Sequence, residues 1–259
     1  MMQPADRAWL RGSPAVNGVH LLEPPSDFEQ EYAAVRTRER RVLNDDQVRL
    51  LPDGSALPNA SEWRIREAGM LRLLGCLKVH APAGQVLEIG CGNGWLAARM
   101  QRAGHHVVGI DPFTAELEQA ARVFPDGPVF VRAQPFTPAL PRDHFDAVVF
   151  AASIQYFADA DAVLQRALQL VRPGGRVHVL DTILYPDAAA ARAAVERSNA
   201  YFTRMGHPGM IGRYHAHQRA ALMALPGARL LDRPGPFLRL RSRLGASPSP
   251  FTHLELSRP

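Results

Sequence analysis

The sequence Glu88-Ile89-Gly90-Cys91-Gly92-Asn93-Gly94-Trp95 decides the fold. It begins in a short apolar run at 85–90, which we interpret as a β-strand, and it leads into a predicted helix at 94–103. A strand that runs through a glycine turn into a helix presents unpaired backbone N–H groups and the positive end of a helix dipole. Because glycine has no side chain, a ligand can approach the backbone closely. The turn is therefore our candidate ligand-binding element.

The spacing of the glycines restricts the ligand. A dinucleotide fingerprint needs its third glycine at position 95, which is Trp95, and a P-loop needs a Gly-Lys-Ser/Thr sequence that is absent here. With the glycines at 90, 92 and 94, a zwitterionic amino acid fits better, its ammonium group facing the acidic Glu88. Asp111 ends the next predicted strand, at 106–110, where a carboxylate can accept hydrogen bonds from both hydroxyls of a ribose.

Strand and helix patterns alternate through the middle of the chain. Further strands are predicted at 128–131, 145–150 and 176–180, and further helices at 159–171 and after Thr114, which we expect to cap its helix. An Ala-rich helix at 187–205, a short helix at 214–223 and strand-like runs at 228–232 and 251–256 complete the chain. Short apolar strands separated by helices indicate an α/β fold with a parallel sheet covered on both faces.

The first eighty residues are predicted to form an N-terminal helical cap. Ser26 and Glu29 have the spacing of a capping box at the start of one helix, residues 45–59 are polar and rich in turn formers, and a second helix starts near Asn59. We therefore expect a cap or lid at 1–80 and a ligand-binding domain at 81–259. Within that domain, 185–225 forms a variable segment.

Four segments, in order, resemble the motifs of the class I S-adenosylmethionine-dependent methyltransferases: VLEIGCGNGWLA (86–97), VVGIDPF (107–113), FDAVVFAASIQYF (145–157) and LVRPGGRVHVLD (170–181). The resemblance covers residues 81–184. It implies a Rossmann-like, doubly wound sheet of seven strands with a reversed terminal strand, and S-adenosylmethionine as the cofactor. It also implies that 185–225 lies on the acceptor side.

The resemblance implies cofactor-binding roles for nine residues: Glu88, Gly90, Gly92, Asn93, Gly94, Asp111, Pro112, Gln134 and Ser153. The three glycines and Asn93 match the loop beneath the methionine portion, Glu88 the acidic position at its ammonium group, and Asp111 the ribose carboxylate. Gln134 is a departure, because the family usually has an aspartate near the adenine amino group. An amide can still accept that hydrogen bond.

The acceptor has to be inferred from the residues beyond the fourth strand. Enzymes of this class that methylate exocyclic amines of DNA bases carry [DNS]-P-P-[YFW] there, whereas this chain has Ser153-Ile154-Gln155-Tyr156. Metal-dependent members place acidic ligands after the fourth and fifth strands, where this chain has Ala151-Ala152 and a single Asp181. We therefore predict no metal site and a small-molecule acceptor methylated on oxygen or nitrogen.

Tyr214 and His217 are the candidate catalytic residues. If 214–223 is helical, they share one face, and a neutral imidazole there could take a proton from a phenol or alcohol near pH 7. The alternative is that these are surface or capping residues.

Composition leaves two further alternatives open. The net charge of +5 invites an RNA or protein methyltransferase, although the basic residues are scattered and the densest groups, at 36–41 and 239–243, are short. The other alternative is a non-catalytic S-adenosylmethionine-binding module. The chain has no apolar run of the ~20 residues that a membrane span needs, no secretory signal pattern and two cysteines, Cys76 and Cys91. We expect a cytoplasmic protein without a nucleic-acid or membrane partner.

Overall fold

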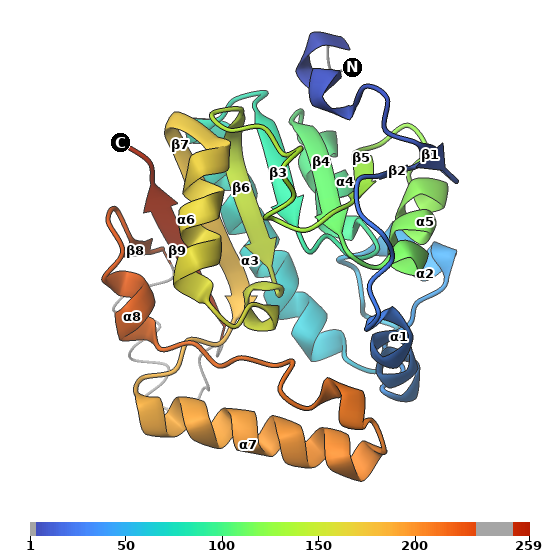
Figure 1. Ribbon diagram of the computed structural model, residues 1–259, viewed down its shortest axis with the longest axis vertical. Helices are drawn as coiled ribbons and strands as arrows, with labels where there is room; N and C mark the ends of the chain where they lie inside the picture. Colours follow the sequence, from blue (N-terminus) through green and yellow to red (C-terminus); the bar gives the residue numbers. More distant parts are fainter. Residues whose placement is uncertain (1–3, 232–250) are drawn as a thin grey trace.

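The computed structural model describes residues 4–231 and 251–259, and these residues form one sheet of nine strands (Figure 1). The spatial order is β1-β2-β5-β4-β3-β6-β7-β9-β8. The strands are β1 (Ala15–Val16), β2 (Val19–Leu21), β3 (Gln85–Ile89), β4 (His106–Asp111), β5 (Val129–Arg132), β6 (Phe145–Ala151), β7 (Val171–Thr182), β8 (Arg229–Leu230) and β9 (Thr252–Ser257).

Seven of these strands form the predicted Rossmann-like sheet. The strands β3 to β7 pair in parallel, whereas β9 is antiparallel to both β7 and β8. The reversed strand is thus the last in the chain and lies between β7 and β8. This topology confirms the predicted fold class.

The sequence did not predict the two strands at the other edge. The strand β2 pairs in parallel with β5, with Val19 opposite Phe130, and β1 folds back on β2. Val19 is fully buried. The first eighty residues therefore contribute to the sheet as well as to the cap.

Helices cover both faces of the sheet, as predicted. In Figure 1, α6 covers the face turned to the viewer, while α3 and α4 cover the far face. The main helices are α1 (Glu29–Arg38), α2 (Asp45–Leu50), α3 (Ala60–His80), α4 (Trp95–Arg102), α5 (Thr114–Val123), α6 (Ala160–Leu170), α7 (Ala188–Met205) and α8 (Arg219–Met223). Short 3-10 turns are η1 (Pro4–Leu10), η2 (Ile154–Tyr156) and η3 (Pro208–Met210). An apolar core packs against each face of the sheet. Successive residues of a strand point to opposite faces, so Val86 of β3 enters one core and Leu87 enters the other.

A third, smaller core joins α1 to α7 and η3, and from here on we call these three elements the cap. Val35 of α1, Phe202 of α7 and Met210 of η3 are buried against one another. Figure 1 shows α1 and α7 at the end of the sheet toward which the parallel strands point. The cap therefore lies over the carboxyl ends of the strands, where ligands bind in open α/β sheets.

Three local predictions about the helix starts and the loop at 45–59 were wrong. Phe28 is the N-cap residue of α1, and Ser26 accepts a hydrogen bond from the Phe28 N–H rather than forming a capping box with Glu29. The polar stretch at 45–59 contains the helix α2, which a capping box of Asn44 and Gln47 begins. Thr114 is the first residue of α5 rather than its cap, and its hydroxyl accepts from Arg132.

The helix predicted at 214–223 begins later, at Arg219. Residues 213–217 have no regular secondary structure, and backbone hydrogen bonds tie them to other segments: the His215 N–H donates to Gln155 and the Tyr185 N–H donates to His217. The basic group at 239–243 and the end of the strand-like run at 228–232 lie outside the described residues.

Candidate functional site

A cavity of about 480 Å³ opens at the carboxyl ends of β3, β4 and β6, beneath the cap. Its volume is within the range of small-molecule sites. Eight of the nine predicted cofactor residues line it: Glu88, Gly90, Gly92, Asn93, Asp111, Pro112, Gln134 and Ser153. The cavity is also lined by residues of α1 and α3, so one space joins the glycine turn to the cap.

The three glycines of the turn meet different surroundings. All have positive φ, at 75° for Gly90, 50° for Gly92 and 73° for Gly94. A Cβ on Gly90 would lie 2.5 Å from the Cβ of Ser153, and one on Gly94 would lie 2.6 Å from the Phe130 ring. These two glycines make room for protein, and Gly94 does not line the cavity. A Cβ on Gly92 would meet the Glu116 carboxylate at 2.9 Å, so this glycine faces the cavity.

Asp111 holds the glycine turn and faces the cavity at once. Its two carboxylate oxygens accept from the backbone N–H groups of Gly92 and Phe113, each at 2.9 Å. A carboxylate has about four acceptor positions, so two remain for a ligand. Burial, and then the neighbouring Glu116 carboxylate, raise the pKa of Asp111 to about 7.

Glu88 is a buried acid whose charge is poorly compensated. Its side chain is 2% exposed, and its Oε2 atom has no hydrogen-bond partner within the described part of the chain. Burial, and then the charge of Asp111, raise its pKa well above the usual range. A buried carboxyl group with a free oxygen in a cavity is suited to a ligand that brings a hydrogen-bond donor or a positive charge.

The prediction missed Glu116, which lies in the first turn of α5 and lines the cavity. Burial has the largest effect and raises the pKa of Glu116, whereas the nearby Arg36 opposes this shift. The sequence shows that Glu116 follows Asp111 by five residues, at the start of a predicted helix. Only the folded chain shows that α5 turns this residue toward Gly92.

The cap contributes an aromatic wall. The Tyr32 ring of α1 stacks on Phe113 at 4.4 Å with an interplanar angle of 17°, and Tyr156 meets Tyr32 edge-on at 6.0 Å. Tyr156 comes after β6 and is 41% exposed. Because Tyr156 lines the cavity, a ligand there would contact the ring. The wall therefore joins the helix α1 to the ends of β4 and β6.

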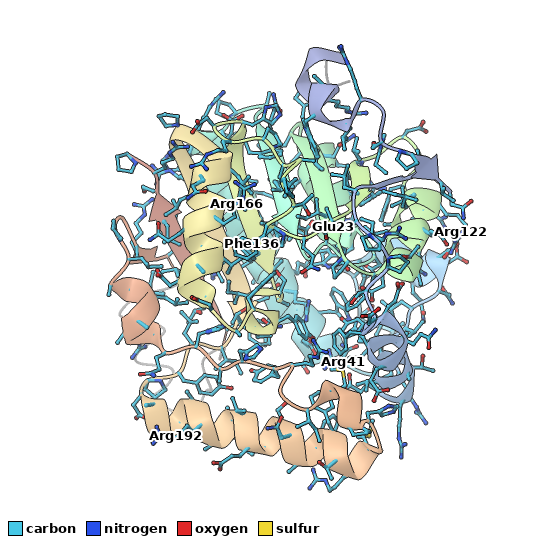
Figure 2. All side chains as sticks on the ribbon, in the orientation of Figure 1. Glu23, Arg41, Arg122, Phe136, Arg166 and Arg192 are labelled. Atoms are coloured by element: carbon cyan, nitrogen blue, oxygen red, sulfur yellow. The ribbon has the colours of Figure 1, made fainter. Side chains whose placement is uncertain are left out.

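Two arginines of the cavity contact the same carboxylate, that of Glu62. Arg41 contacts Glu62 through two nitrogens, at 3.0 and 3.1 Å, and Arg66 contacts the same carboxylate at 2.7 Å. Figure 2 shows Arg41 between the sheet and the cap helix α7. Glu62 holds these two guanidinium groups, and they lower its pKa to about 2 against the opposing effect of burial.

The comparisons with known proteins agree with this geometry. Residues 87–179 match the family described as a methyltransferase domain. The resemblance that the sequence motifs implied is therefore confirmed over this region of the chain. The cofactor of this family is S-adenosylmethionine.

Several curated methyltransferases are similar in sequence. An uncharacterized methyltransferase of Mycobacterium tuberculosis is 38% identical over 96 residues, which are 37% of this chain and 49% of that protein. The 27-O-demethylrifamycin SV methyltransferase of Amycolatopsis mediterranei is 33% identical over 156 residues, 58% of this chain and 57% of that protein. The chain thus spans about half the length of these relatives.

Solved methyltransferase structures share the fold. The YcgJ protein of Bacillus subtilis superposes with a TM-score of 0.57 at 11% identity, covering 74% of this chain and 98% of that one. A possible histamine N-methyltransferase of Thermotoga maritima gives a TM-score of 0.53 at 18% identity, covering 90% and 98%.

The cavity has groups that S-adenosylmethionine would need. The unpaired Oε2 of Glu88 can accept from an ammonium group, and the free acceptor positions of Asp111 can take the two ribose hydroxyls. Gly92 lets the methionine portion approach the turn. The Ser153 hydroxyl already donates to the Ile89 carbonyl at 2.6 Å, so this serine supports the turn from below.

The two predicted catalytic residues do not share a helix face. Tyr214 and His217 precede α8, and neither lines the cavity. The His217 ring nitrogen Nε2 lies 3.1 Å from the Ile154 carbonyl, and the Tyr214 hydroxyl lies 3.4 Å from that of Tyr185. Burial lowers the pKa of His217. Burial also raises the pKa of Tyr214 well above 10, its ordinary value. Their observed contacts hold the segment 213–217 against η2 and Tyr185.

Two further negative findings concern the described residues. Within 4–231 and 251–259, no three His, Cys, Asp or Glu side chains are grouped as metal ligands would be. No helix in these ranges combines the length and the hydropathy that membrane crossing requires.

Proposed function

We propose that this protein transfers a methyl group from S-adenosylmethionine to an oxygen or nitrogen atom of a small organic molecule. The observation that carries the proposal is the shared cavity. Glu88 and Asp111 at the strand ends, Tyr32 of the cap and Tyr156 after β6 line one space of about 480 Å³. A cofactor and an acceptor bound there would be neighbours, as direct transfer requires.

The cofactor would occupy the strand-end half of the cavity. Glu88 would bind its ammonium group, Gly92 and Asn93 would lie beneath the methionine portion, and Asp111 would accept from the ribose. Pro112 and Gln134 would flank the adenine. When bound, S-adenosylmethionine supplies an activated methyl group. The protein then has to align the acceptor with it and exclude water.

The acceptor would occupy the cap half. Aromatic rings such as Tyr32 and Tyr156 present flat apolar faces and a polar edge, which suits small organic molecules. The names of the relatives support this class: one acts on 27-O-demethylrifamycin SV, and another, from Rhodopseudomonas palustris, is a ubiquinone biosynthesis O-methyltransferase that is 34% identical over 94 residues. Cys76 and Cys91 are unpaired, which supports a reducing compartment such as the cytoplasm.

A general base is required only for an acceptor that carries a proton at the working pH. The His217 ring contacts the Ile154 carbonyl and lies outside the cavity lining. Its role in this proposal is to position the segment 213–217 rather than to take a proton. Alignment of the acceptor against the aromatic wall would then provide most of the rate.

The decisive experiment is methyl transfer from methyl-labelled S-adenosylmethionine into a metabolite extract. We expect label in at least one small molecule, and none when protein is omitted. Calorimetry with S-adenosylhomocysteine measures the cofactor half independently. Asp111→Asn should weaken this ligand by about 10- to 100-fold, because a charge-assisted hydrogen bond contributes about 1.5–3 kcal/mol.

The matched control is Asp126→Asn, which makes the same chemical change at an exposed position outside the cavity. It should leave the affinity unchanged. Tight binding of S-adenosylhomocysteine without label in any small molecule would refute the enzyme and favour a binding module. Absence of binding by the unmodified protein would refute the cofactor site itself.

A further inference from the structure

Arg36 is a cation in the cavity without a close partner in the described part of the chain. It projects from α1 and lines the cavity, and its Nε atom is buried with no hydrogen-bond partner among the described residues. Its guanidinium lies 5.8 Å from the centre of the Tyr32 ring. The other cavity arginines that contact acids, Arg41 and Arg66, are both engaged by Glu62.

The acids nearest to Arg36 do not neutralise it by contact. Glu116 and Glu39 interact with it electrostatically, but no carboxylate of the described chain lies within 4.0 Å of it. Glu39 instead accepts a hydrogen bond from the Tyr201 hydroxyl at 2.9 Å and forms an ion pair with Arg41 at 3.5 Å. A guanidinium stays charged at any physiological pH, so this charge cannot be removed by losing a proton.

A buried, unpaired charge is costly, and a ligand that pairs with it recovers that cost. Arg213 also lines the cavity without a carboxylate contact in the described chain, but it lies over the Phe28 ring at 4.8 Å. Beside the buried carboxyl groups, the guanidinium of Arg36 favours a ligand with a single negative charge over a phosphate with two. The planar fork of arginine matches the two oxygens of a carboxylate. Next to it, Tyr32, Phe113 and Tyr156 offer ring faces and edges for a flat body.

The cofactor's own carboxylate is a poorer candidate for this partner. Glu88, which we assign to the methionine end of the site, lies in β3 beside the glycine turn, whereas Arg36 projects from α1 over the Tyr32 ring. The groups around Arg36 are Tyr32, Tyr156, Glu116 and Glu39, which lie on the cap side or at the start of α5. Arg36 therefore lies beside the aromatic wall that we assign to the acceptor half.

We propose that the methyl acceptor is an aromatic molecule with a carboxylate group and that Arg36 binds this carboxylate, while the methyl group goes to another atom of the molecule. This inference rests on the proposed methyltransferase function. It names Arg36 as the residue that selects the acceptor.

The first test separates the labelled products of the extract experiment on a strong anion exchanger. We expect the main labelled product to be retained at pH 8 and released at pH 2, where a carboxylate is protonated. Retention at both pH values would indicate a phosphate, and passage at pH 8 would indicate an uncharged acceptor or methylation of the carboxylate itself. Either result would overturn the inference and leave the proposed function intact. Absence of any labelled product would instead count against the proposed function.

The second test changes Arg36 and uses the isolated labelled acceptor. Arg36→Gln should raise the KM for the acceptor by about 10- to 100-fold with a smaller change in kcat, because the carboxylate binds before and during transfer. Arg36→Lys keeps the charge but not the planar fork, so its KM should lie between that of the unmodified protein and that of Arg36→Gln. The control Arg64→Gln removes the same charge from an exposed position on α3 and should change nothing.

Two measurements on Arg36→Gln distinguish acceptor binding from other roles. Its melting temperature should not fall, because the substitution removes a half-buried charge that has no acidic contact in the described chain. Its affinity for S-adenosylhomocysteine should equal that of the unmodified protein. A loss of cofactor affinity as large as the rise in KM would show that Arg36 serves the cofactor, and an unchanged KM would show that it does not bind the acceptor.

Discussion

Asp181 provides a sharp test of the electrostatics beneath the cavity. It is 5% exposed, its Oδ2 atom has no hydrogen-bond partner in the described chain, and burial raises its pKa from 3.8 to about 6, with Arg66 opposing the effect. Its backbone φ of 57° lies in the left-handed region, which asparagine adopts readily. Asp181→Asn therefore removes the charge without new backbone strain.

The sign of the effect is set by the raised pKa. Between about pH 4 and pH 6 the folded protein keeps this proton while the unfolded chain has released it, so the free energy of unfolding falls as the pH rises. A pKa raised from 3.8 to about 6 corresponds to a penalty of about 3 kcal/mol above pH 7. About half of that penalty is already present at pH 5, and the remaining ~1.4 kcal/mol develops between pH 5 and pH 8.

Urea denaturation at pH 5, 6, 7 and 8 measures this difference. The stability of Asp181→Asn relative to the unmodified protein should increase by about 1.4 kcal/mol from pH 5 to pH 8. Any cost of burying the amide is independent of pH and cancels in this comparison. Asp126→Asn, at an exposed site, should behave like the unmodified protein. Parallel curves for Asp181→Asn and the unmodified protein would refute the raised pKa and the uncompensated burial behind it.

Three further predictions separate packing from ligand binding. Gly94→Ala should destabilise the protein by about 2–4 kcal/mol in thermal unfolding, because a side chain at φ 73° is strained and its Cβ would collide with Phe130. Gly92→Ala should cost only ~1 kcal/mol of stability but weaken the binding of S-adenosylhomocysteine in calorimetry. A larger loss of stability for Gly92→Ala than for Gly94→Ala would refute the assignment of Gly94 to packing and of Gly92 to the ligand. The affinity for S-adenosylhomocysteine should rise with pH through about 7, with proton release on binding, since ribose hydroxyls favour the charged form of Asp111; a pH-independent affinity from 6 to 8 would contradict this. His217→Ala should lower the melting temperature through loss of its bond to the Ile154 carbonyl, yet change turnover less than ~3-fold, whereas a loss of ~100-fold would restore the general-base role.

The sheet was predictable because each of its central strands is a short, mostly apolar run next to a glycine turn or a helix start. Gln85–Ile89 and Phe145–Ala151 are strands in the structure to within one residue of their predicted bounds. The strands β1 and β2 were missed because two or three residues cannot show a period, and Val19 is buried by pairing with Phe130, more than a hundred residues away.

Helix starts were harder to predict where a distant segment competes for the capping group. Glu29 had the right spacing for a capping box with Ser26, but its carboxylate accepts from the Ala115 N–H of α5 at 2.9 Å. By contrast, the sequence held a usable signal at Asn44 and Gln47, which form a complete capping box. A local pattern predicts a helix start when the capping partner is local as well.

The same division explains the site. The proposed cofactor half consists of residues at the ends of parallel strands, and these ends meet at one edge of the sheet whatever the loops do. The acceptor half depends on where α1 lies, and the stacking of Tyr32 on Phe113 that fixes it joins residues far apart in the sequence. Arg36 therefore appeared in the sequence only as part of a basic group at 36–41.

The charge of the whole chain gives a misleading picture of its site. The net charge of +5 suggested a polyanionic partner, yet the cavity places four arginines (Arg36, Arg41, Arg66 and Arg213) against five carboxyl groups (Glu39, Glu62, Glu88, Asp111 and Glu116). A phosphate backbone needs a continuous positive surface. Here Glu88, Asp111 and Glu116 lie at the ends of β3 and β4 and at the start of α5, where they would suit a cofactor rich in donors and positive charge. On the cap side, the guanidinium of Arg36 remains unpaired among the described residues. An acceptor would therefore be oriented by the separation of positive and negative groups within the cavity, and not by the net charge of the cavity.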